Sequence, residues 1–79
     1  MKKRINGHTY NTNTAKLMVS VKGDLDRGGN WYKEMLYETE DHLYFLVGVG
    51  GELTRWNGET GLIALDKDAV DFWRKKRNC

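Results

Sequence analysis

The stretch His42-Leu43-Tyr44-Phe45-Leu46-Val47-Gly48-Val49 decides the fold. Its residues alternate as in a β-strand, yet both of the resulting faces are almost entirely apolar. A strand that is apolar on both faces is typical of the middle of a sheet, where each face is covered by other elements. We therefore expect residues 42–49 to form a central strand, which Gly48, Gly50 and Gly51 end or kink at a bulge.

Three further segments alternate around this strand. Residues 15–22 predict a half-buried strand with one apolar face, formed by Ala15, Leu17, Val19 and Val21. Residues 31–38 predict another strand, whose more polar side carries Tyr32 and Glu34, and residues 62–65 predict a short last one. The pairs Asn6-Gly7 and Asn57-Gly58 are hairpin-turn signals, and residues 39–41 supply a further turn.

Residues 67–77 predict the single helix. Asp66 is a good N-cap, Asp68 places negative charge in the first turn, and four cations fill the last turn. Ala69, Val70 and Trp73 form an apolar stripe at helical spacing. The predicted fold is α+β, with a four- to five-stranded antiparallel sheet and one C-terminal helix packed on one face, in a single small domain spanning residues 1–79.

Composition sets limits on the class of protein. The 79 residues are 30% charged and 11% aromatic, which does not fit a disordered chain. No apolar run is long enough for a membrane span or a signal peptide. The single cysteine, Cys79, has no partner for an internal disulfide. These features predict an intracellular, cytoplasmic protein that does not associate with membranes.

Charge is distributed unevenly along the chain although the net charge is only +2. Residues 1–22 carry five cations and no acid, residues 23–68 carry ten acids against four cations, and residues 69–79 are basic again. If the two basic ends met on one face, they would form a positive patch opposite a negative one. The alternative is an ordinary solvated surface of mixed charge.

The sequence holds no recognisable catalytic or metal-binding pattern. Gly48–Gly51 lacks the Lys-Ser or Lys-Thr pair and the following helix of a phosphate loop. His8, His42 and Cys79 are too scattered for a zinc site. Ser20, the only serine, has no visible base beside it. We therefore expect a non-enzymatic protein with no cofactor and no metal.

Two aromatic residues stand out as candidates for a binding surface. Tyr32 falls on the polar side of its strand, and Trp56 follows Arg55 between two glycine-rich turns. Exposed Trp and Tyr beside Arg are typical of interface hot spots and also stack on unpaired bases. We expect Arg55 and Trp56 to project from a loop and Trp73 to be core. The alternative is that Trp56 covers the edge of the core.

Several motifs resemble one group of proteins. Residues 4–17, RINGHTYNTNTAKL, resemble the opening I-N-G-K-x-Y-[DN]-T-x-T-A-x-L of small proteins from Gram-positive bacteria, their phages and integrative elements. The segments EMLYET at 34–39 and YFLVGVGG at 44–51 resemble their later motifs, in the same order. The resemblance implies a protein of the anti-CRISPR or anti-defence type. The basic, short ending departs from the longer acidic helix common in that group.

The leading hypothesis is an inhibitor from a phage or mobile element that binds a bacterial defence effector such as a CRISPR nuclease complex. It would fill a basic nucleic-acid groove with a locally acidic surface. The predicted partner-binding residues are Asp24, Asp26, Tyr32, Glu34, Glu38, Glu40, Asp41, Arg55 and Trp56. The alternative is a nucleic-acid-binding module that uses the basic N-terminal strands and the C-terminal helix. Both a monomer and a homodimer fit the sequence.

Overall fold

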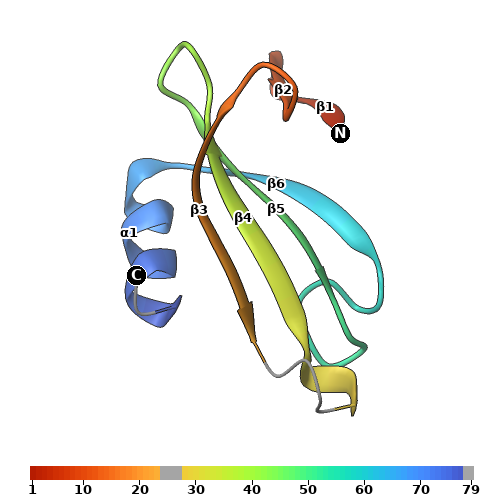
Figure 1. Ribbon diagram of the computed structural model, residues 1–79. Helices are drawn as coiled ribbons and strands as arrows, with labels where there is room; N and C mark the ends of the chain where they lie inside the picture. The colour runs from red at the N-terminus through yellow and green to blue at the C-terminus, as the bar shows by residue number, and fades with distance from the viewer. Residues whose placement is uncertain (24–27, 78–79) are drawn as a thin grey trace.

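The computed structural model describes residues 1–23 and 28–77. It has a four-stranded antiparallel sheet, a separate two-stranded hairpin and one helix, which confirms the α+β prediction (Figure 1). The sheet order is β3-β4-β5-β6, from Lys16–Gly23, Tyr32–Glu38, Tyr44–Gly50 and Thr60–Leu65. The hairpin pairs β1, Lys2–Ile5, with β2, His8–Asn11, and the helix α1 spans Lys67–Arg77. A short 3-10 turn occupies Gly28–Asn30.

The connections follow the sequence signals closely. Asn6 and Gly7 have φ of 51° and 82°, and Asn57 and Gly58 have φ of 50° and 80°, as the predicted Asn-Gly turns require. Asp66 caps α1, because its Oδ1 accepts a 2.7 Å hydrogen bond from the backbone N–H of Ala69. The helix begins and ends where the sequence predicts. No helix within the described ranges is long and apolar enough to cross a membrane.

The sheet has a separate core on each face, as Figure 1 shows by the positions of α1 and of the β1–β2 hairpin. Between α1 and the sheet lies one cluster of five buried residues: Leu36, Leu46, Trp56, and Val70 and Trp73 of α1 itself. On the opposite face, β2 places Tyr10 against a second buried cluster with Phe45, Val47 and Leu62. β5 contributes to both clusters, which confirms the expectation of a central strand covered on two sides.

Two details of the strands differ from the expectation. The register of β3 against β4 shifts between Leu17 and Val19, so Met18 is an extra residue at a bulge. Leu17 therefore pairs with Tyr37 on the hairpin face, whereas Val19 pairs with Leu36 under the helix, and the predicted single apolar face of residues 15–22 is wrong. In β5, Gly48 neither ends nor kinks the strand, which continues in register to Gly50.

Candidate functional site

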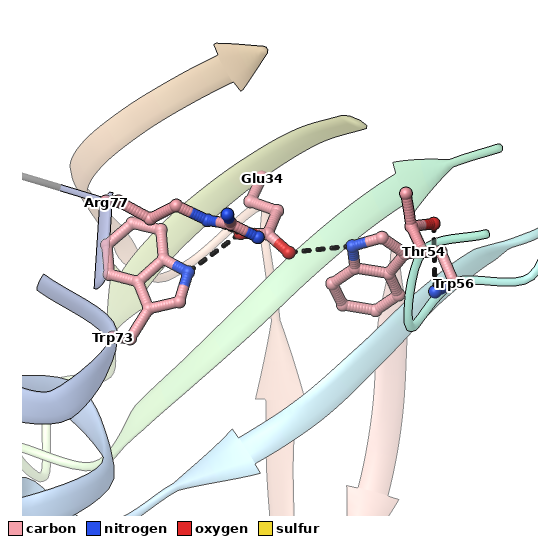
Figure 2. Close-up of polar contacts among 5 residues, drawn as sticks. All are labelled: Glu34, Thr54, Trp56, Trp73 and Arg77. Carbon is pink, nitrogen blue, oxygen red and sulfur yellow. Dashed lines mark hydrogen bonds and ion pairs between the residues drawn. The ribbon is translucent and has the colours of Figure 1, made fainter. Parts of the chain in front are cut away.

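The most concentrated polar chemistry of the described chain lies between the sheet and α1, at Glu34. Alternation along β4 places Glu34 on the helix-covered face, next to Leu36, and its exposed fraction is 0%. Its carboxylate accepts three hydrogen bonds of 2.8 Å: from Trp56 Nε1 to Oε2, and from Trp73 Nε1 and Arg77 Nε to Oε1 (Figure 2). We call these four residues the Glu34 network.

Glycines make room for the Trp56 ring in this network. Glu34, Gly48 and Gly61 are neighbours in one row across β4, β5 and β6. A Cβ added to Gly48 would overlap the indole of Trp56, and one added to Gly61 would lie 3.1 Å from it. The ring therefore lies against bare backbone on two adjacent strands. A hydrogen bond from the Thr54 hydroxyl to the carbonyl of Gly51, 2.7 Å long, helps to fix the loop that carries Trp56.

The charge of Glu34 is stabilised although the group is buried. Burial alone would raise the pKa of Glu34, but the hydrogen bonds from Arg77, Trp73 and Trp56, together with the charge of Arg77, lower it below its ordinary value. Arg77 also stacks over the ring of Tyr32, with its guanidinium carbon 3.9 Å from the ring centroid. Every buried side-chain nitrogen and oxygen of the described residues has a hydrogen-bond partner. The network therefore ties the helix and a loop to the sheet.

This arrangement corrects two of the predicted partner-binding residues. Glu34 belongs to no exposed acidic surface, because the face that looks polar from the sequence is the face that α1 covers. Trp56 is only 7% exposed, so the prediction that it projects from its loop is wrong and the alternative, a core position, holds. One signal for the burial of Glu34 was present in the sequence: alternation puts it on the same strand face as the apolar residue Leu36.

The other predicted residues fall into different places. Tyr32 is half-buried beneath Arg77, whereas Arg55 is exposed in the loop before Trp56. Glu40 and Asp41 are exposed in the β4–β5 turn. Asp24 and Asp26 lie outside the described residues. The members of the predicted set that the structure describes therefore do not lie together on one surface.

An acidic surface does exist at one end of the sheet. Glu38 pairs with Tyr44, and Tyr44 with Leu65, so the β4–β5 turn and the first turn of α1 lie at the same end of the sheet (Figure 1). We call this the acidic end, and its five carboxylates are Glu38, Glu40, Asp41, Asp66 and Asp68. His42 Nδ1 lies 3.0 Å from Glu38 Oε2, and this hydrogen bond lowers the pKa of Glu38.

The basic ends of the chain do not form the single patch that the charge pattern suggested. The β1–β2 hairpin packs on one face of the sheet and α1 on the other. Lys2, Lys3 and Arg4 therefore belong to the hairpin on one face and the last turn of α1 to the other face, although Lys3 also lines a hollow at the free edge of β6.

The described residues contain no group of three or more His, Cys, Asp or Glu side chains placed to hold a metal ion. No family model matches the chain, no curated protein is significantly similar to its sequence, and no solved structure is significantly similar to its fold. The resemblance to small proteins of phages and mobile elements therefore rests on the quoted motifs alone.

Proposed function

We propose that this is a non-enzymatic binding protein from a phage or mobile element, and that it inhibits a bacterial defence complex of the CRISPR type in the bacterial cytoplasm. The motifs at residues 4–17, 34–39 and 44–51 support the class of protein. The observation that carries the mode of binding is the acidic end, where four exposed carboxylates and the half-buried Glu38 lie at one end of the sheet.

The acidic end suits a basic groove that normally holds nucleic acid. Carboxylates of two elements, the β4–β5 turn and the first turn of α1, concentrate negative charge at one end of the sheet, as a stretch of phosphates concentrates it along a strand. Lys16 and Lys67 lie at the same end, so the surface is locally rather than uniformly acidic. With a net charge of +2, the protein imitates a short stretch of nucleic acid at most.

Charge reversal at the acidic end tests this proposal. The double variant Glu40→Lys/Asp41→Lys changes two exposed side chains of the turn and should abolish inhibition of DNA or RNA cleavage by purified CRISPR effector complexes. The matched control is Glu52→Lys/Glu59→Lys, which makes the same charge change at exposed positions away from the acidic end. Melting curves should show that both variants fold. Equal inhibition by the two variants, or no inhibition by the unmodified protein across several effector types, contradicts the proposal.

A gel shift distinguishes the nucleic-acid-binding alternative. If the protein retards single- or double-stranded probes, with binding that weakens by roughly 0.7–0.9 log units per phosphate contact for each tenfold rise in salt, it binds nucleic acid directly. We expect no retardation, because the hairpin and the helix that carry most of these cations pack on opposite faces of the sheet.

A further inference from the structure

The two edge strands of the four-stranded sheet, β3 and β6, differ in how well they are protected against pairing with a strand of another chain. β3 carries Lys16, Lys22 and a bulge, three features that natural edge strands use to avoid pairing. β6 reads Thr-Gly-Leu-Ile-Ala-Leu and has no charge, no proline and no register shift against β5. Among the described residues, the backbone of β6 pairs only with β5. The other side of β6 therefore offers a row of free backbone donors and acceptors.

A groove follows this open edge. One hollow is lined by residues from both faces of β6, including Ile63 and Leu62, so it runs along the free edge of the strand. A second hollow of about 150 Å³ lies between the end of β6 and α1, with Leu65, Ala69 and Phe72 among its apolar walls. Arg55 lines both hollows and joins them. We call the two together the β6 groove.

The rim of the β6 groove is cationic. Lys3 and Arg55 line the hollow along the strand, and Lys76 and Arg77 line the hollow beside the helix. Glu59 is the single acid among the lining residues of the two hollows. The walls of the hollow beside α1 are largely apolar, and Phe72 is 70% exposed there. A cationic rim beside an apolar hollow is complementary to a segment that carries both acidic and apolar side chains.

We propose that the β6 groove binds an extended acidic segment of a partner protein, which adds a strand to the sheet at β6. Its main chain would pair with the open edge, and its carboxylates would face Lys3, Arg55 and Lys76. One apolar side chain would enter the hollow beside α1, whose volume is enough for a benzene-sized group. A second copy of this chain is a poorer occupant, because it would bring the same cations to the same groove. This interaction uses a different surface from the acidic end and does not depend on the proposed inhibition.

Nuclear magnetic resonance of the full ¹⁵N-labelled chain tests the proposal. The probe is a pool of ten-residue peptides in which Asp or Glu alternates with Val, Ile, Thr or Phe, and the control pool has Lys or Arg in place of the acids. We expect the acidic pool to shift the backbone amides of β6 and slow their hydrogen exchange, and to bind at least about tenfold more tightly than the basic pool. The amides of β3 should not respond.

Charge reversal on the rim provides the matched comparison. Arg55→Glu/Lys76→Glu should weaken binding of the acidic pool by about tenfold or more, whereas Lys22→Glu/Lys33→Glu, the same charge change on an exposed pair of β3 and β4, should weaken it less than about twofold. Four results would overturn the proposal: no shift with the acidic pool, equal binding of both pools, equal loss in both variants, or protection of β6 amides by self-association without peptide.

Discussion

The two faces of the sheet are buried by different means. Under α1, a charged carboxylate receives hydrogen bonds from two indoles and a guanidinium, all of them 2.8 Å long. Under the β1–β2 hairpin, contact is between rings: Tyr37 stacks on Phe45 with centroids 5.1 Å apart, and Tyr10 tilts against the same ring at 5.4 Å. One face is organised by directed polar contacts and the other by apolar area.

This difference affects how each face tolerates change. Hydrogen bonds to a buried charge are directional, so they require the donors in one arrangement. Removing one partner leaves buried polar groups without a hydrogen bond. Aromatic contacts vary smoothly with geometry and lose stability in proportion to the area removed. We therefore expect removal of Glu34 from the helix-covered face to lower the free energy of unfolding of the whole domain. Truncation of a ring on the hairpin-covered face should instead destabilise only the hairpin.

The largest effect is expected for Glu34→Ala. It leaves Arg77 and the two indole N–H groups without their acceptor, and breaking such a buried pair costs about 3–5 kcal/mol. A chain of this size has a total free energy of unfolding of about 4–12 kcal/mol, so the variant should lose a large share of its stability. Urea denaturation measures the loss. Glu38→Ala, on the same strand but at the exposed turn, is the control, and a comparable loss there would show that Glu34 has no special role.

Tyr10→Ala examines the hairpin-covered face. Tyr10 is 5% exposed and packs on Phe45, so its truncation should cost about 3 kcal/mol. Amide hydrogen exchange should show the loss confined to β1 and β2, because the rest of that cluster belongs to the sheet itself. Equal loss of protection in β4 and β5 would mean that the hairpin and the sheet unfold as one unit, which contradicts the expected local failure.

Gly48→Ala tests whether the helix-covered face needs a bare backbone at Gly48 to accommodate the Trp56 ring. The added methyl group would meet the Trp56 indole, and overpacking of this kind costs about 2 kcal/mol. In a Trp56→Ala background the ring is gone and the same substitution should be nearly neutral, so a double-mutant cycle measures the coupling. If the two substitutions lower the free energy of unfolding additively, Gly48 is needed for the conformation of the strand and not for the packing of the Trp56 ring.

Acidification gives the mildest expected effect, because a protonated Glu34 keeps its place and can still accept hydrogen bonds. Its pKa is lowered in the folded protein, so its stabilisation is complete above the ordinary value of about 4.3 and is lost as the pH falls through the lower folded value. Urea midpoints from about pH 7 to about pH 3 should therefore converge for the unmodified protein and Glu34→Gln, which cannot titrate there. A constant difference between the two would show that folding does not lower the pKa of Glu34.

Local signals in the sequence were enough for most of the fold. The Asn-Gly pairs, the cap at Asp66 and the apolar strand predicted at 42–49 each act over a few residues, and the structure confirms all three, with the strand at Tyr44–Gly50 and His42 in the preceding turn. The bulge at Met18 was missed because perfect alternation gives no indication of an inserted residue. The Glu34 network was missed because it depends on a row of residues on three strands and on a helix, whose register is a property of the whole sheet.

The hydrogen bonds of Glu34 have a kinetic consequence. They join residues that are 22, 39 and 43 positions apart in the chain, whereas β3 to β6 are linked one after another by short hairpin connections. Short loops close before long ones, so the hairpins can form while α1 is still undocked. The network would then be completed after the rate-limiting step of folding, and its strength would govern how slowly the native chain opens rather than how fast it forms. In a newly made chain, the hydrogen bonds of Glu34 can be completed only once Arg77 has been added.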